Sequence, residues 1–251
     1  MWNHDNVHRL QVGPVPIDFC EPEVAWNAVA TRQLRGAVHL CNAYTIALAD
    51  ERPDLSDALN ANCVNFPDGM PLVWWAKRRN IAVSNRVYGP DLMEAVLDRG
   101  RAHGLRHYLY GSTPEVLDGL VAAISQRWPG VEIVGVESPP FRELTDEEVA
   151  ESVQRAADLG ADVVWVGMGT PKQDLLTERM ASLGAATYVA IGAAFDFIAS
   201  TKSQAPMWMQ RSGLEWFYRL VTEPRRLWKR YLVYNVKFIR ILWRARSATV
   251  A

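Results

Sequence analysis

The sequence predicts an α/β fold in which helices cover both faces of a mostly parallel sheet. Between about residues 36 and 200, short apolar runs alternate with longer segments of helical periodicity. This alternation of strands and helices is typical of parallel sheets. Of the 251 residues, 49% are hydrophobic and 22% are charged, so the chain can build a packed core. We expect one domain over residues 1–200 and a basic, tryptophan-rich helical appendage over residues 201–251.

The elements are expected in the following order. A small hairpin or edge strand over residues 12–19 turns at Gly13-Pro14 and precedes the alternating pattern. Apolar runs predict strands over 37–41, 63–66, 107–110, 132–136, 162–166 and 187–191. Helical periodicity predicts helices over 90–102, 114–127, 146–159 and 171–183, and several of these segments open with a proline or with an Asp or Thr start signal. Thr145 lies three residues before Glu148, which is close to a capping box.

Cysteine usage and hydropathy limit the class of protein. Cys20, Cys41 and Cys63 form no CxxC pair and lie in apolar segments, which favours buried free thiols and no metal site. The N-terminus has no secretion signal, and no apolar run reaches about 18 residues, so we expect no spanning helix. These features predict a cytoplasmic protein.

The C-terminal segment is strongly basic. Between residues 207 and 251 there are ten arginines and lysines but only two acids, Glu215 and Glu223. Such a segment favours an anionic partner: phosphate, nucleic acid or an acidic lipid surface. Apolar residues near helical spacing, next to a basic stripe, predict an amphipathic helix that lies at a membrane interface; they are Leu227, Tyr231, Phe238 and Leu242. The alternative is a solvated helix face. Because the core resembles no nucleic-acid reader, we expect no nucleic-acid partner.

The loops after the predicted strands are the expected ligand site, because open α/β sheets bind ligands beyond the carboxyl ends of their strands. Gly167 and Gly169 precede a predicted helix N-terminus at Pro171, and Lys172 adds a positive charge. This arrangement favours a phosphate-bearing ligand. It matches neither the dinucleotide fingerprint nor a Walker loop. The alternative is a tight turn between a strand and a helix.

Asp68 is the strongest candidate for acid–base chemistry. It follows a predicted strand, where a carboxylate can accept a proton from an attacking hydroxyl group. An N-cap for a helix that starts near Gly69 would explain the same residue type equally well. Asp196 is a weaker candidate in the loop after the last strand.

With these residues in view, the chain resembles the WecG/TagA/CpsF family of glycosyltransferases (family 26) from about Val12 to Phe238. The motifs occur in the order that the family has. The matching segments are ANCVNFPDG (61–69), RVYGPDL (86–92), GMGTPKQ (167–173), GAAFDF (192–197) and, most specific, APMWMQRSGLEWFYRLVTEPRRL (205–227).

The resemblance implies a Rossmann-like domain and an inverting, metal-independent transfer. A sugar of the N-acetylmannosamine type would move from a UDP-sugar to a polyprenyl-diphosphate-linked sugar, at the inner face of the cell membrane and without a cofactor. The base would be Asp68. The expected donor-binding residues are Asn42, Gly69, Arg86, Gly89, Asp91, Gly111, Gly167, Gly169, Pro171, Lys172, Gln173 and Asp196. The residues expected at the acceptor diphosphate or the membrane are Arg211, Arg219, Arg225, Arg226, Lys229 and Arg230.

One position departs from the family. Many members have a threonine where this chain has Leu40, although Asn42 is kept. The departure bears on the identity of the sugar more than on the class of reaction. Two alternatives stay open: a nucleotide-sugar hydrolase, and a non-catalytic membrane-binding protein with a vestigial nucleotide site. Self-association that covers the apolar appendage is a further expectation.

Overall fold

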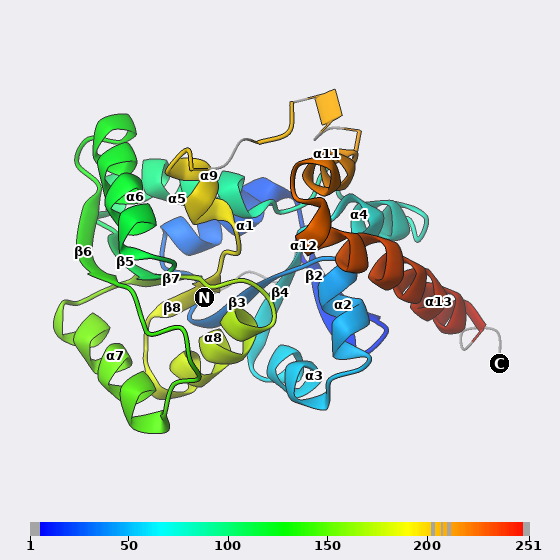
Figure 1. Cartoon of the computed structure of the whole chain (residues 1–251), viewed down its shortest axis with the longest axis horizontal. Coiled ribbons are helices and arrows are strands. Elements are labelled where there is room, and N and C mark those ends of the chain that lie inside the picture. The colour runs from blue at the N-terminus through cyan, green and yellow to red at the C-terminus, as the bar shows by residue number, and fades with distance from the viewer. Residues whose placement is uncertain (1–5, 202–203, 207, 210–211, 248–251) are drawn as a thin grey trace.

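A parallel sheet forms the centre of the molecule. The computed structural model describes residues 6–201, 204–206, 208–209 and 212–247 (Figure 1). Six strands pair in the order β4-β3-β8-β7-β5-β6, and each neighbouring pair is parallel. The strands are β3 (Gly36–Cys41), β4 (Cys63–Pro67), β5 (Arg106–Gly111), β6 (Glu132–Glu137), β7 (Val163–Gly167) and β8 (Thr187–Ala190). The predicted fold class and the six predicted strands are confirmed.

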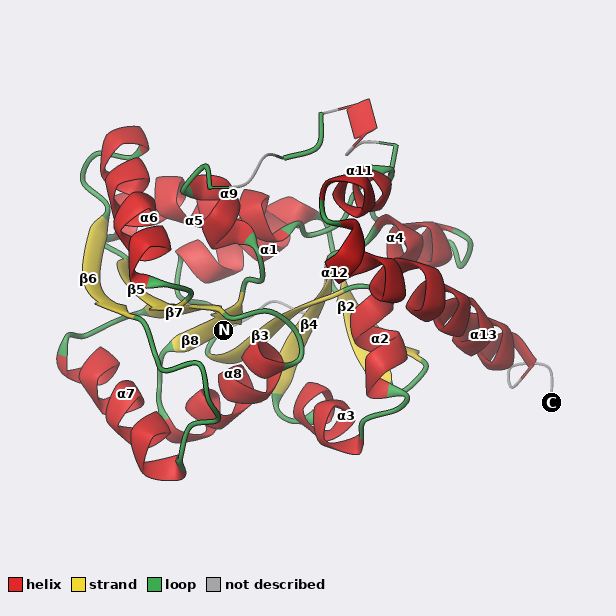
Figure 2. Ribbon diagram, in the orientation of Figure 1, coloured by secondary structure: helices red, strands yellow, loops and turns green. Residues whose placement is uncertain are grey.

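Helices cover both faces of this sheet (Figure 2). One face packs against α1 (Pro22–Ala30), α5 (Gly89–Gly100), α6 (Pro114–Arg127) and α9 (Ala194–Ile198). The other packs against α7 (Asp146–Asp158) and α8 (Lys172–Leu183), and α8 contacts α3 (Pro53–Asn60). Side chains of β7 alternate between the faces: Trp165 joins the α5 side, while Val164 and Val166 join the α8 side. Both faces are therefore buried, which explains the continuous apolar runs in the sequence.

An N-terminal hairpin lies beside β4. Its strands are β1 (His8–Val12) and β2 (Val15–Phe19), antiparallel and joined at Gly13-Pro14, so the predicted turn is confirmed. The Asn65 amide of β4 donates to the Pro16 carbonyl oxygen at 2.9 Å. The Asp18 carboxylate accepts from the Asn65 backbone N–H at 2.8 Å. These contacts tie the hairpin to the strand that precedes Asp68.

The C-terminal segment is helical and packs on the domain. It comprises α11 (Glu215–Thr222), α12 (Pro224–Trp228), a π-helical segment (Lys229–Val233) and α13 (Tyr234–Ser247). Phe238 and Ile241 of α13 are buried in the cluster that includes α2 (Ala43–Ala49). Lys237 forms an ion pair with Glu51 just beyond α2. A Cβ at Gly13, whose φ is +61°, would lie 2.4 Å from Ile241 Cγ2, so the hairpin turn needs glycine here.

This packing differs from the expected amphipathic helix. Of the apolar positions expected to face a membrane, Leu227 and Phe238 are buried in the protein. A different stripe on the same helices is exposed, at spacings of three and four residues: Trp228, Leu232, Val236, Ile239 and Trp243. The segment is therefore apolar on two sides, and the predicted membrane-facing side includes residues that pack on the protein.

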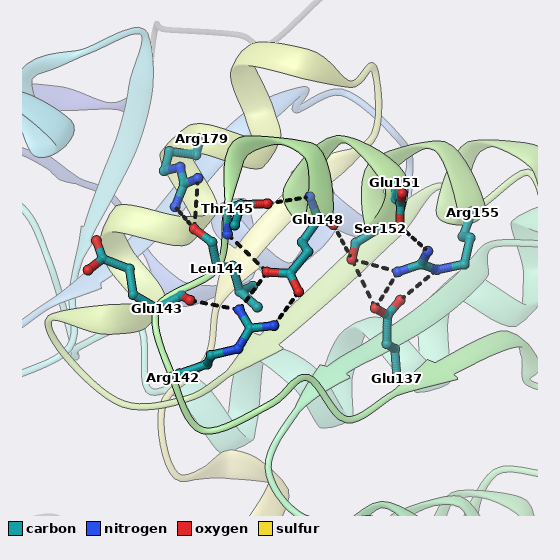
Figure 3. Close-up of polar contacts among 10 residues, drawn as sticks. All are labelled: Glu137, Arg142, Glu143, Leu144, Thr145, Glu148, Glu151, Ser152, Arg155 and Arg179. Carbon is teal, nitrogen blue, oxygen red and sulfur yellow. Dashed lines mark hydrogen bonds and ion pairs between the residues drawn. The ribbon is translucent and has the colours of Figure 1, made fainter.

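The segment between β6 and α7 is fixed by a polar network (Figure 3). The Thr145 hydroxyl oxygen accepts from the Glu148 backbone N–H at 3.3 Å, and the Glu148 carboxylate accepts from the Thr145 N–H at 3.0 Å. The predicted capping box is confirmed. Arg142 adds a hydrogen bond of 2.7 Å to the same carboxylate. Ser138 Oγ donates to the Ser112 carbonyl oxygen at 2.8 Å, which joins the start of the segment to the loop after β5. The start of the segment is thus held beside the carboxyl edge of the sheet, and its end is fixed to the first turn of α7.

Candidate active site

A continuous cleft runs along the carboxyl edge of the sheet. Three adjoining cavities form it. The base cavity contains Asp68, the outer cavity of about 710 Å³ lies along the loop at Gly169, and a bridging cavity touches both residues. Arg230 lines all three cavities. The loops after β3, β4, β7 and β8 therefore converge on one site, which the C-terminal segment completes.

Asp68 directly follows β4 and is half-buried in the cleft. Its backbone N–H donates to the Cys41 carbonyl oxygen at 2.7 Å, which holds it against the end of β3. Its Oδ1 accepts from the Gly89 N–H at 3.3 Å, at the first turn of α5. The N-cap of α4 (Met70–Lys77) is Gly69, and no side chain caps that helix, so the N-cap interpretation of Asp68 is wrong.

The cleft changes the acidity of Asp68. Burial raises the pKa of the Asp68 carboxyl group to about 7, and the Glu215 carboxylate acts in the same direction. The guanidinium groups of Arg86 and Arg219 act in the opposite direction. A carboxyl group that titrates near neutral pH is suited to general base catalysis.

Arg86 and Tyr88 link the domain to the C-terminal segment. Arg86 forms an ion pair with Glu215 of α11, and the Tyr88 hydroxyl donates to Glu215 Oε1 at 2.9 Å. The Arg86 guanidinium also lies 4.0 Å from the centre of the Tyr88 ring. Its Nη1 reaches the Asp68 backbone carbonyl oxygen at 3.4 Å. Glu215 is only 6% exposed, so the helix that carries it is docked in the base cavity.

Asn42 and Gln173 shape the loops of the cleft. Asn42 is the N-cap of α2, and its Oδ1 accepts from the N–H groups of Tyr44 and Thr45 at 3.0 and 3.2 Å. Gln173 Oε1 accepts from the Gly169 N–H at 2.8 Å and from the Gly192 N–H at 3.0 Å. One amide oxygen thus joins the loop after β7 to the loop after β8.

The Gly167 loop lines the outer cavity, together with Asp196. Pro171 is the N-cap of α8, so the helix begins at Lys172, one residue later than predicted. Lys172 lines the same cavity at that N-terminus. A helix N-terminus and a lysine together favour a bound phosphate group.

Among the described residues of the C-terminal segment, three cations reach the cleft. Arg219 lines the base and bridging cavities, and Lys229 lines the outer one. The Arg230 guanidinium lies 4.5 Å from the centre of the Tyr44 ring. Its buried Nε has no hydrogen-bond partner among the described residues, and burial lowers the pKa of Arg230. Arg230 belongs to the π-helical segment, and such departures from α-helical geometry are frequent at functional sites.

The remaining predicted site residues that the structure describes fall into two groups. Gly69, Arg86 and Gly89 line the base or bridging cavity, as expected for site residues. Asp91, Gly111 and Arg225 do not line the three cavities described. A Cβ at Gly111 would lie 2.7 Å from the Gly167 carbonyl oxygen, so this glycine permits the close approach of β5 and β7. Arg211 lies outside the described residues, as does the side chain of Arg226.

Sequence reasoning missed several residues of the site. Tyr44, Tyr88 and Glu215 were not among the predicted site residues, yet all three line the base cavity. One usable signal was present for Glu215, because it is one of two acids in a basic segment. Aromatic residues carry no such signal, since most are core residues.

Two features are absent from the described part of the chain. No group of three or more His, Cys, Asp or Glu side chains in the described part of the chain is arranged to hold a metal ion. Nor is any helix there both long and apolar enough to span a bilayer.

The fold is α/β, and among the described residues the cleft at the carboxyl edge of the sheet holds the Asp68 carboxyl group, whose pKa is raised, together with several cationic side chains. The family model "Glycosyl transferase WecG/TagA/CpsF family" matches residues 10–250, so the chain belongs to this family and is a glycosyltransferase. The resemblance seen in the sequence is confirmed. A relative from Bacillus subtilis (strain 168) is 32% identical over 180 residues, which is 71% of this chain and 68% of the relative. That relative is an N-acetylglucosaminyldiphosphoundecaprenol N-acetyl-beta-D-mannosaminyltransferase.

Proposed function

We propose that this enzyme transfers a sugar of the N-acetylmannosamine type from a UDP-sugar to a polyprenyl-diphosphate-linked sugar, with inversion and without a metal. The product would enter a cell-surface polymer. The single observation that carries the proposal is the half-buried Asp68, with a pKa raised by burial to about 7, in a cleft lined by Arg219 and Arg230. The name of the Bacillus subtilis relative supports the choice of the transferred sugar and of the lipid-linked acceptor.

Asp68 is the base in this proposal. The acceptor hydroxyl oxygen forms a bond to the anomeric carbon, and the bond from that carbon to the diphosphate oxygen of UDP breaks. The hydroxyl proton passes to the Asp68 carboxylate. The geometry supports this role, because a single protein hydrogen bond, from the Gly89 N–H, reaches that carboxylate among the described residues. One displacement with one base inverts the anomeric centre.

Cationic groups would stabilise the leaving diphosphate. Lys172 lies at the N-terminus of α8 on the outer cavity, and Arg230 lies where the cavities meet. Fixed positive groups at a developing negative charge lower the barrier, and charge-assisted hydrogen bonds to phosphate are strong. These side chains supply the positive charge that a divalent ion would otherwise bring.

The C-terminal segment, taken as residues 201–251, would hold the enzyme at the anionic inner face of the membrane. The support is the exposed stripe on α12 and α13, in which Trp243 is 73% and Ile239 61% exposed. Basic residues such as Arg240 and Arg244 lie on the same helix. Aromatic and apolar side chains beside arginines are typical of interfacial helices. Self-association would cover the same stripe.

The test measures UDP release from a panel of UDP-sugars, with and without a polyprenyl-diphosphate N-acetylglucosamine acceptor. Wild type, Asp68→Asn and Asp57→Asn are compared, where Asp57 is an exposed aspartate of α3 that serves as a matched control. Release that depends on the acceptor and is lost only in Asp68→Asn is expected. Release indifferent to the acceptor would instead indicate a hydrolase, and no release on acceptor-bearing liposomes would indicate a non-catalytic protein.

A further inference from the structure

Glu215 is an acid in a segment that otherwise attracts anions. Residues 207–251 hold only two acids, and Glu215 is 6% exposed at the start of α11. An acid here opposes the binding of a diphosphate, and burying its charge costs free energy unless it is paired. Its position therefore calls for a specific partner.

That partner is Arg86. The Glu215 carboxylate binds the Arg86 guanidinium through one oxygen and accepts from the Tyr88 hydroxyl at 2.9 Å through the other. Arg86 is thereby held so that it reaches the backbone carbonyl oxygen of Asp68 at 3.4 Å. Among the described residues, no ion pair joins Arg86 to the Asp68 carboxylate. The guanidinium therefore lies close to Asp68 but, among the described contacts, binds its backbone and not its carboxylate.

We propose that Glu215 is a positioning residue for Asp68: it holds the Arg86 guanidinium off the Asp68 carboxylate and leaves that carboxylate free to accept a proton. The inference rests on the proposed role of Asp68 as the base. It assigns the C-terminal segment a function in the chemical step besides substrate and membrane contacts. The base is completed only when α11 is docked.

The charges around Asp68 explain why a counter-charge is needed. The charged side chains that act on it are Arg86 from the loop before α5, Arg219 and Glu215 from α11 and Arg230 from the π-helical segment, and the Gly89 N–H donates to it. The uncharged Tyr88 hydroxyl and Cys41 thiol, whose pKa values are raised, also interact with it. All three arginines favour the ionised carboxylate, which would make it a weak base. Glu215 is the one acid in that set, and it offsets part of this effect.

The test titrates the Asp68 carboxyl carbon by NMR in ¹³C-labelled full-length protein without substrate, with Asp68→Asn used to assign the signal. Wild type is expected to titrate near 7. Glu215→Gln keeps the shape of the side chain but removes its charge and one of the two acceptor oxygens that Arg86 and Tyr88 use, so the midpoint falls by about one pH unit or more. Glu223→Gln, the same change at the other acid of the segment, leaves the midpoint unchanged. Glu215→Asp restores most of the wild-type value.

The pH profile of kcat/KM is measured on the same variants. Glu215→Gln is expected to shift its rising limb to lower pH by the same amount and to lower the plateau, because a weaker base accepts the proton less well. An unshifted carboxyl titration overturns the inference. If the midpoint of the Asp68 titration shifts but the pH profile of kcat/KM does not, the positioning role of Glu215 is supported and the role of Asp68 as the base is overturned. If Glu215→Gln does not fold, Arg86→Gln probes the same contact. The midpoint of the Asp68 titration is expected to rise in this variant, and an unchanged midpoint would overturn the inference.

Discussion

Replacing Arg230 with methionine should make the protein more stable and much less active. Arg230 lines all three cavities, and its Nε is buried without a hydrogen-bond partner among the described residues. The neighbouring Arg219 repels it, which acts with burial to lower the pKa of Arg230. Its described favourable interactions include the contact with the Tyr44 ring at 4.5 Å and a longer-range attraction to Asp68. In the absence of ligand, this charge therefore costs stability.

The magnitudes can be worked from these contacts. A buried donor of a charged group left without a partner costs about 1–3 kcal/mol. Removing Arg230 also removes the cation–π contact with Tyr44, which offsets roughly 0.5–1 kcal/mol of the gain in stability. Arg230→Met should thus stabilise the apo-enzyme by about 1 kcal/mol, which corresponds to a rise in Tm of roughly 2–4 °C for a chain of this size. Loss of a preorganised cation at the diphosphate should lower kcat by about 10²-fold.

Thermal unfolding and acceptor-dependent UDP release measure the two effects. Arg35→Met is the matched control, since Arg35 is exposed at the amino end of β3, opposite the cleft. It should change neither quantity. A fall in Tm for Arg230→Met would show that the guanidinium stabilises the fold. Unchanged turnover would show that it does not act on the diphosphate. Either result would refute the reasoning.

Three further outcomes follow from the structure. Because Asp68 must be ionised to accept a proton and its pKa is raised to about 7, kcat/KM should rise as the pH increases through about 7. Phe238→Ala should lower the free energy of unfolding by about 3–5 kcal/mol, measured by thermal unfolding, because Phe238 is buried against α2. The exposed neighbour gives the contrast: Ile239→Ala should leave Tm unchanged and weaken binding to anionic vesicles. Burial alone lowers the pKa of His39, but its hydrogen bond to Asp174 raises that pKa to about 9. The stabilisation of the fold by the protonated imidazole is therefore complete below a pH of about 6.5 and is lost as the pH rises through 9. The Tm of Asp174→Asn should consequently fall less than that of wild type over this pH range.

The sheet was predictable from the sequence because both of its faces are buried. Strands such as β5 and β7 appear as short apolar runs bounded by glycine, and their ends were located to within a residue. The helices that open with clear start signals were found as well; α6 begins at Pro114 and ends at Arg127, as expected. Short helices such as α2 and α9 were not predicted. They span seven and five residues, too few for helical periodicity to stand out.

The candidate site was predictable in part. The strand-end rule located the loops at Asp68 and Gly167, because in a parallel sheet all carboxyl ends meet at one edge. The contact between Tyr88 and Glu215 joins residues 127 apart in sequence, and no local pattern encodes it. For a related reason, the sequence did not predict which face of α13 packs on the protein and which is exposed. Both are apolar, and the tertiary contact of Phe238 decides which one is buried.

In the proposed mechanism, the cleft has two conflicting electrostatic requirements, and the C-terminal segment satisfies both. A diphosphate leaving group requires positive charge, which Arg219 and Arg230 bring into the cleft. The same charge would stabilise the ionised form of Asp68 and weaken it as a base. Glu215 lies one helical turn before Arg219, so a single docking event delivers the cation together with the acid that limits its effect on the base. An enzyme whose α11 is undocked would lack both groups at once, which would couple turnover to the placement of this segment.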